Sequence, residues 1–162
     1  MALGDITILS SPFSGTGPVD TFKVSAGTTA SINAGEPVLK ALGSSVVAAL
    51  ATNKPVVGTD YLAGISTTDS DETASAAGYV SVLKLVPGVV YLCNANSAAA
   101  VDTQAEYDAL VGDRVLFDLT NGTYTVLTTD GATNGLVIEP LDITKYPGKI
   151  AFSIRSGCAY FA

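Results

Sequence analysis

The sequence predicts a mainly β protein: a compact β-sandwich or barrel-like domain with one short helix and an extended N-terminal arm. Two observations carry this prediction. Apolar residues make up 48% of the chain, but with only five Phe and no Trp the core must be built from small and β-branched side chains, which favour sheets. Short apolar runs are also separated by turn residues about every ten positions, as in compact β folds. A chain of 162 residues needs only a single core.

Residues 1–18 are expected to form an extended arm rather than a packed element, and residues 19–162 a single β-rich domain. The arm has one charged side chain, Asp5, and is otherwise rich in Ser, Gly and Pro, as flexible termini often are. Its one alternating apolar stretch could add a strand to the exposed sheet edge of a partner. The candidate binding residues in this stretch are Ile6, Thr7, Ile8 and Leu9.

The next part of the chain predicts a series of short strands. Residues 21–24 form the first, and a Gly-Glu-Pro turn starts another at residues 37–39, whose leading proline restricts it to an edge or a strand start. Residues 46–50 and 61–65 are further apolar runs. Residues 66–77 are polar and lack hydrophobic periodicity, which predicts a solvated loop.

A Pro-Gly turn joins the next two apolar runs, residues 79–86 and 89–93. Pro87 presets φ for a turn, and Gly88 permits positive φ. The two runs are therefore expected to pair with each other as a buried hairpin.

One short helix is expected between Asp102 and Gly112. Thr103 and Glu106 have the Thr-x-x-Glu spacing of a capping box. Gly112 follows the last helical position, where a left-handed residue commonly ends a helix.

The strongest local signal is Asn121-Gly122 between two alternating runs, residues 114–120 and 123–128. Both residues of a type I′ turn need positive φ, which Asn and Gly tolerate. A two-residue turn fixes the register and gives the hairpin one core face and one wetter face. The predicted cross-strand pairs are Leu119 with Tyr124, Phe117 with Val126, and Asp118 with Thr125.

Two late strands, residues 136–138 and 150–155, are separated by the turn Tyr146-Pro147-Gly148. The chain then ends with apolar residues. Such a terminus on a chain with few charges needs cover, which predicts self-association. Tyr160 and Phe161 are the candidate residues for an oligomer interface.

The composition argues against catalysis. The sequence has no His, which removes the commonest general base at neutral pH and the commonest zinc ligand. We therefore expect no enzyme, no cofactor and no metal. The run Asp69-Ser70-Asp71-Glu72 offers alternating oxygens to a calcium ion, but it lacks the Gly and the distant Glu of the twelve-residue calcium loop, and a solvated acidic loop is the preferred interpretation.

Two further sets of residues have a functional and a structural interpretation. Cys93 and Cys158 lack the Cys-x-x-Cys spacing of a metal or redox site; two buried thiols are the first interpretation and a disulfide the alternative. Tyr79, Tyr91 and Tyr124 could form a carbohydrate platform, although aromatic residues on strands are more often core or cross-strand partners.

The charge pattern excludes several partners. The net charge is −7, from 15 acidic and 8 basic residues, and no basic run is present to bind phosphates, so nucleic acid is not an expected partner. The longest apolar runs are far short of the roughly 20 residues that span a bilayer, so no membrane association is expected. The start of the chain lacks the pattern of a secretory leader, which predicts synthesis in the cytosol. Charged residues make up only 14%, and so uncharged a surface is often covered by a partner.

Several segments follow one another in a characteristic order: residues 34–38, residues 61–65, the polar loop at Asp69, and residues 79–93. In this order the chain resembles the capsid decoration (cement) proteins of tailed bacteriophages, a family similar to the lambda head decoration protein. There an arm precedes a Gly-acidic-Pro-Val turn, a strand that ends in Gly-Ile, a polar loop and a Val-rich hairpin. The resemblance covers residues 35–93.

The resemblance implies a β-tulip-like domain with a flexible arm on the exterior of the capsid, commonly as a trimer at three-fold or quasi-three-fold positions. The implied function is that of a structural virion protein, made in the host cytoplasm, which binds the outer surface of a tailed-phage capsid and stabilises it by bridging neighbouring subunits. The implied partners are the major capsid protein and further copies of the chain, as a homotrimer or else a dimer, without a small-molecule substrate. The helix and the Asn121-Gly122 hairpin have no counterpart in the lambda protein, which leaves the oligomeric state open.

Two alternatives stay open at this point. One is another structural component of the same kind of particle: a tail-tube, head-completion or fibre protein. The other is a secreted carbohydrate- or ligand-binding β module, against which the missing leader and the missing Trp count.

Overall fold

The protein is mainly β, as the sequence predicts. The computed structural model describes residues 6–10, 18–27, 31–50, 53–120 and 123–160. Within these residues the strands form three antiparallel sheets, none of which closes into a complete barrel. They are accompanied by one α-helix and two short 3-10 helices.

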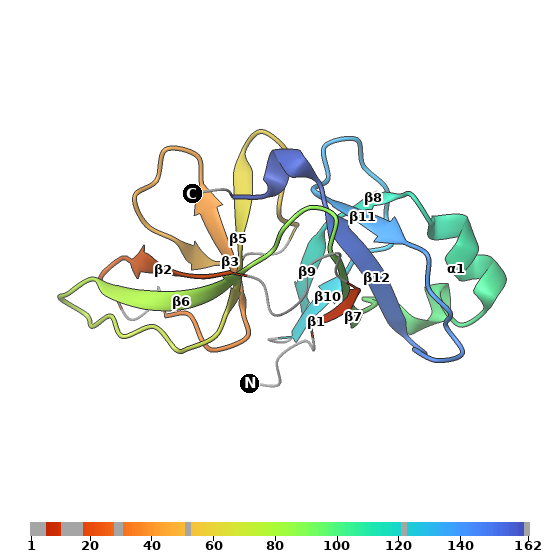
Figure 1. Cartoon of the computed structure of the whole chain (residues 1–162), viewed down its shortest axis with the longest axis horizontal. Coiled ribbons are helices and arrows are strands. Elements are labelled where there is room, and N and C mark those ends of the chain that lie inside the picture. Colours follow the sequence, from red (N-terminus) through yellow and green to blue (C-terminus); the bar gives the residue numbers. More distant parts are fainter. Residues whose placement is uncertain (1–5, 11–17, 28–30, 51–52, 121–122, 161–162) are drawn as a thin grey trace.

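Sheet B, a five-stranded sheet, builds one end of the elongated molecule, which we call the N-terminal lobe (Figure 1). Its strand order is β2-β6-β5-β3-β4. The bounds are β2 (Val19–Val24), β6 (Gly78–Lys84), β5 (Asp60–Ser66), β3 (Pro37–Ala41) and β4 (Ala48–Ala49).

Sheet A and the β9–β10 hairpin build the other end, the C-terminal lobe, together with the α-helix. The strand order of sheet A is β1-β7-β12-β11-β8. Its bounds are β1 (Thr7–Ser10), β7 (Val90–Asn94), β12 (Lys149–Ile154), β11 (Leu136–Glu139) and β8 (Arg114–Val115). The hairpin pairs β9 (Phe117–Thr120) with β10 (Thr123–Val126), and the helices are η1 (Ala98–Ala100), α1 (Gln104–Leu110) and η2 (Ser156–Cys158).

Two hydrophobic clusters fill the molecule where the sequence predicted a single core. The smaller cluster lies within sheet B and includes Val38 and Ala63. The larger one fills the C-terminal lobe but also takes in Leu39 and Leu62, the chain neighbours of those two residues. Because successive strand residues point to opposite faces, β3 and β5 are buried on both faces, and sheet B is the shared wall between the two clusters.

Sheet B curls strongly around the smaller cluster, which gives it a barrel-like shape. Its two edge strands approach each other at one point, where the backbone amide of Val47 donates a hydrogen bond to the carbonyl of Lys23 at 2.9 Å. Val24 and Val47 form an isolated parallel bridge there. Small and β-branched side chains fill this tight curl, which agrees with the composition.

The predictions for the helix and the hairpin are confirmed. The Thr103 side chain accepts a hydrogen bond from the Glu106 amide, and the Glu106 carboxylate accepts one from the Thr103 amide, so both halves of the capping box are present. Gly112 has a φ of 93° directly after the helix. The hairpin pairs are those predicted; Phe117, Tyr124 and Val126 are buried, whereas Leu119 is exposed. Residues 121–122 lie outside the described residues.

The predicted hairpin of residues 79–86 and 89–93 is wrong. The first run forms β6 in sheet B and the second forms β7 in sheet A, so the Pro87-Gly88 turn carries the chain from one lobe to the other. The reason is that β6 is already paired on both sides, with β2 and with β5. A strand without a free edge cannot also take the next segment as its partner.

Two other strand predictions differ in extent. The run 46–50 contributes only the two-residue strand β4. The late runs form β11 and β12, which pair with each other in antiparallel register from Leu136 opposite Ile154 to Glu139 opposite Ala151.

Candidate interaction surface

The stretch predicted as a binding arm is a strand of the chain's own sheet. β1 pairs with β7, with Thr7 opposite Leu92, Ile8 opposite Tyr91 and Ser10 opposite Val90. The sequence predicted instead that residues 1–18 pack on no part of their own domain. The alternation that makes this stretch suited to a foreign sheet edge suits the edge of β7 equally well.

The side chains of this stretch divide into anchors and exposed groups. Ile6 and Leu9 are partly buried against the larger cluster, whereas Thr7 and Ile8 are exposed. The register shifts between Ile8 and Ser10, so that Leu9 is an extra residue on β1, as in a β-bulge. The far side of β1 is an edge of sheet A within the described residues.

A second candidate surface lies on the N-terminal lobe, on the exposed face of β2 and β6; the edge of β2 itself is bridged by Val47 at Lys23 and Val24. β2 is the outer strand of sheet B, and Val19 on it is 55% exposed, while Tyr79 on the adjacent β6 is 56% exposed. The charges nearby include Lys23, which is exposed, and an ion pair between Lys84 and Asp20. Val19 is opposite Leu83 and Tyr79 is opposite Lys23, so the two side chains are separate exposed apolar points on this face and not one continuous patch.

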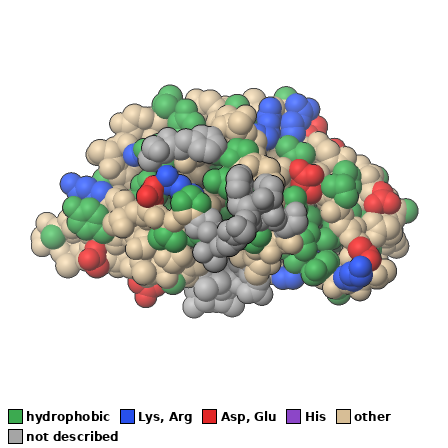
Figure 2. All heavy atoms as spheres, in the orientation of Figure 1, with side chains coloured by type: hydrophobic (Ala, Val, Ile, Leu, Met, Phe, Trp, Pro, Cys, Tyr) green, Lys and Arg blue, Asp and Glu red, His purple; other side chains and the backbone are tan. Residues whose placement is uncertain are grey.

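Charged groups are sparse over the face of the molecule in Figure 2, where uncharged polar groups, backbone and scattered hydrophobic side chains make up most of the surface. This agrees with the low charged fraction of 14%. A partner that covers a surface of this kind meets a smaller desolvation cost than on a charged surface.

Tyr160, the predicted oligomer-interface residue, packs on its own chain. Its ring makes edge contacts with the rings of Phe22 and Tyr61, at centroid distances of 5.8 and 6.3 Å. The Lys40 ammonium lies 5.2 Å from the centre of the same ring, a cation–π distance. The cover that this apolar terminus needs is therefore supplied in part by sheet B. Phe161 lies outside the described residues.

The carboxylates of the acidic loop bind backbone amides of neighbouring segments. Asp69 accepts a hydrogen bond from the Ala34 amide at 2.8 Å, and Asp71 accepts one from the Tyr79 amide. Hydrogen bonds from Ser31 and Ser70 lower the pKa of Glu72. These contacts join the loop to the start of β6 and to the segment before β3. The described residues contain no group of three or more Asp, Glu and Cys side chains that could hold a metal ion.

The carbohydrate platform is not formed. Tyr91 and Tyr124 are buried, and only Tyr79 of the three is exposed. Tyr91 and Phe152 pack at a centroid distance of 5.7 Å in the larger cluster, and the Tyr124 hydroxyl donates a hydrogen bond to the Leu50 carbonyl at 2.9 Å.

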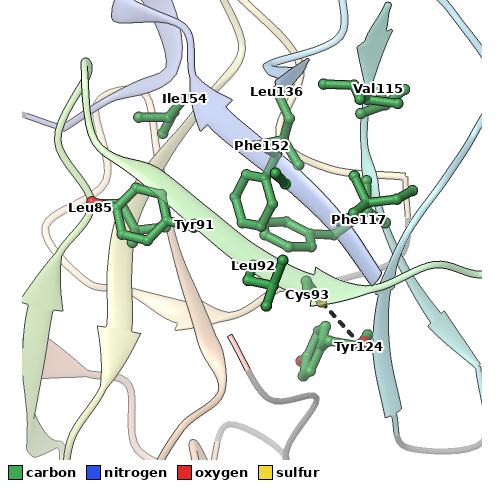
Figure 3. Close-up of a cluster of buried hydrophobic side chains, with 14 of the residues drawn as sticks. Leu85, Tyr91, Leu92, Cys93, Val115, Phe117, Tyr124, Leu136, Phe152 and Ile154 are labelled. Carbon is green, nitrogen blue, oxygen red and sulfur yellow. Dashed lines mark hydrogen bonds between the residues drawn. The ribbon is translucent and has the colours of Figure 1, made fainter. Parts of the chain in front are cut away.

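The two cysteines are buried thiols and not a disulfide. The Cys93 thiol donates a hydrogen bond to the Tyr124 carbonyl, with 3.6 Å between sulfur and oxygen (Figure 3). Burial raises the pKa of the Cys158 thiol to about 11. Since the thiolate is the reactive form, Cys158 is poorly suited to nucleophilic chemistry.

Comparisons with known proteins found no matching family model, no similar curated protein and no similar solved structure. No helix in the described part of the chain is long and apolar enough to cross a membrane. The candidate functional surface thus consists of the strand edge and exposed apolar side chain at β1 on the C-terminal lobe, and of the exposed apolar side chains of β2 and β6 on the N-terminal lobe.

Proposed function

We propose that this chain is a structural virion protein that binds the outer surface of a tailed-phage capsid and stabilises it by bridging neighbouring capsid subunits. The observation that carries the proposal is the edge strand β1, with Ile8 exposed on it. An exposed strand edge pairs readily with a strand of another protein, and its side chains add specificity.

The order of segments in the sequence supports the same proposal. The turn before β3, the strand β5, the acidic loop and the strand β6 are the parts that resemble capsid decoration proteins, and together they build most of sheet B. The resemblance does not extend to a hairpin of β6 with β7, since these strands lie in different sheets.

The distribution of the two candidate surfaces suits a bridging role. β1 lies in the C-terminal lobe and β2 in the N-terminal lobe, each as the first strand in its sheet order. One molecule could therefore contact two neighbouring subunits. Each such contact is modest, but many copies acting together would stabilise a shell. The net charge of −7 suits the exterior of a shell better than its DNA-filled interior.

The proposal is tested by co-sedimentation of the purified protein with undecorated capsids of the phage that encodes it. Ile8→Asp places a charge on the β1 edge and should weaken capsid binding strongly. Leu119→Asp is the matched control, because Ile8 and Leu119 are strand residues that are 38% and 37% exposed. Equal binding by wild type, Ile8→Asp and a variant that starts at Val19 would refute a role for β1.

The two alternative functions predict different results for the same purified protein. A tail-tube, head-completion or fibre component would form rings or tubes without capsids and would not bind to undecorated capsids. A carbohydrate-binding module would retain glycans on an array, which the burial of Tyr91 and Tyr124 disfavours.

A further inference from the structure

The contact between β1 and β7 joins the start of the chain to its middle through a short stretch of pairing. Three residue pairs define the register, and the side-chain anchors are Ile6 and Leu9. Beneath them, Tyr91 and Leu92 of β7 are buried. The edge of β7 is therefore an apolar binding site, and the short strand β1 is bound there.

β1 and the next strand along the chain, β2, belong to opposite lobes. β1 lies in sheet A and β2 in sheet B, and residues 11–18 connect them. A connection of this length spans at most about 29 Å when fully extended. A second molecule alongside the first is within that reach, and a distant one is not.

We propose that the edge of β7 also takes β1 from a second copy of this chain, so that neighbouring copies exchange their first strands. Every contact of β1 in the exchanged arrangement is one that the single chain already makes, which makes such exchange a low-cost route to oligomers. Concentration then decides between the closed and the exchanged form.

The bulge favours the chain's own strand over other apolar strands. Ile8 pairs with Tyr91 and Ser10 with Val90, which leaves Leu9 as the extra residue. A regular strand would be out of register with β7 on one side of this point, and its side chains would change faces. A second copy of β1 has the extra residue at the required position.

Exchange can be reciprocal between two copies or can pass around a closed ring. In a ring of three, the β7 edge of each copy would bind β1 from the next copy. Head-to-tail contacts of this kind form a ring when the rotation between successive copies closes. The proposal concerns the purified protein and does not depend on capsid binding, so the two can fail separately.

The test adds one cysteine to each of two variants, Ser10→Cys and Val90→Cys. The two added thiols can join only between chains, and the native Cys93 and Cys158 are buried in the folded protein. Ser10 and Val90 are partners in the β1–β7 register, and the Cα atoms of such partners lie at a spacing that suits a disulfide. The two variants, one with a longer tag, are unfolded, mixed, refolded together at about 0.1 mM and oxidised. A docked pair has an effective local concentration in the millimolar range, so we expect about tenfold or more linked heterodimer than from a mixture of Ser10→Cys with Leu42→Cys, a control thiol in an exposed turn.

The double variant Ser10→Cys/Val90→Cys shows that the pair is competent. Linked oligomers that increase with protein concentration during refolding support exchange. A disulfide formed only within single chains at every concentration, together with no heterodimer above the control, overturns the proposal. If Val90→Cys does not fold, the pair Thr7→Cys and Leu92→Cys, at the other end of the β1–β7 register, replaces it in the same design.

Discussion

The hydroxyl group of Tyr107 donates a hydrogen bond to the backbone carbonyl of Glu139, at 2.8 Å. The same hydroxyl accepts a hydrogen bond from the backbone amide of Ala151, at 2.9 Å. Glu139 and Ala151 are the last pair of the β11–β12 register. One side chain of α1 therefore satisfies two backbone groups at the end of a sheet, and it fixes the helix to sheet A.

Replacing this hydroxyl should destabilise the protein. Tyr107→Phe keeps the buried ring but leaves the Glu139 carbonyl and the Ala151 amide without this partner, which costs about 1–3 kcal/mol of unfolding free energy. Urea denaturation followed by circular dichroism measures the loss. Tyr79→Phe is the control, because Tyr79 is exposed and its substitution should change the midpoint little. Equal midpoints for the two variants would contradict the role given to the hydroxyl.

Stability should fall in alkaline solution because of two buried tyrosines. Burial is the main cause that raises the pKa of Tyr107 and that of Tyr124 to about 12, above the value of about 10 of an unfolded chain. The unfolded state therefore releases these protons first as the pH rises, and stability that is complete below pH 10 is lost between about pH 10 and 12.

Each tyrosine should contribute up to about 2–3 kcal/mol to this loss. Urea midpoints at increasing pH measure it, and Tyr124→Phe should show a weaker dependence than wild type. A Tyr124→Phe protein with the same pH dependence as wild type would show that Tyr124 ionises normally in the folded state.

Gly64 should not tolerate a side chain. A Cβ atom at this position would lie 2.0 Å from the carbonyl oxygen of Leu83 on the adjacent strand. Gly64→Ala should therefore cost about 3 kcal/mol or more, since backbone must move to admit it. Gly43→Ala is the control: Gly43 has a φ of +75° but open space around it, so only the backbone strain of about 1–2 kcal/mol applies. Thermal melts should rank wild type, Gly43→Ala and Gly64→Ala in that order.

The two thiols should be unreactive in the folded protein. Cys93 and Cys158 are fully buried, and the pKa of Cys158 is raised to about 11, so its thiolate is scarce at pH 8. A colorimetric thiol reagent should modify neither until urea is added, whereas the exposed thiol of Leu42→Cys should react at once. Rapid modification of the folded wild type would mean that the C-terminal lobe opens readily.

The local elements follow from the sequence because their signals act over a few residues. The capping-box spacing at Thr103 and the Asn-Gly pair at residues 121–122 each predict the local backbone directly, and the helix and the hairpin register agree with these predictions. The pairing of β6 is different, because it depends on β2 and β5 having taken both of its edges. No pattern within residues 79–93 contains that information.

The candidate interaction surface was predictable only in part. The alternation of Ile6 to Leu9 indicates a strand, but the sequence does not say whose edge that strand joins. Tyr160 looked like a residue in need of a partner, and the partners proved to be Phe22 and Tyr61, far away in the chain. Val19 and Tyr79 are exposed although they are apolar, since they lie on the outer faces of β2 and β6, whose other face is buried.

Each lobe is completed by a segment from the far end of the sequence: β1 joins sheet A, and residues 159–160 return to sheet B, where Ala159 bridges Leu62 and the Tyr160 amide donates a hydrogen bond to the Leu62 carbonyl. Contacts this distant in sequence raise the contact order, which slows folding. On the ribosome, sheet B lacks these contacts until residues 159–160 have emerged. Folding of sheet B should therefore be complete only after that point in synthesis.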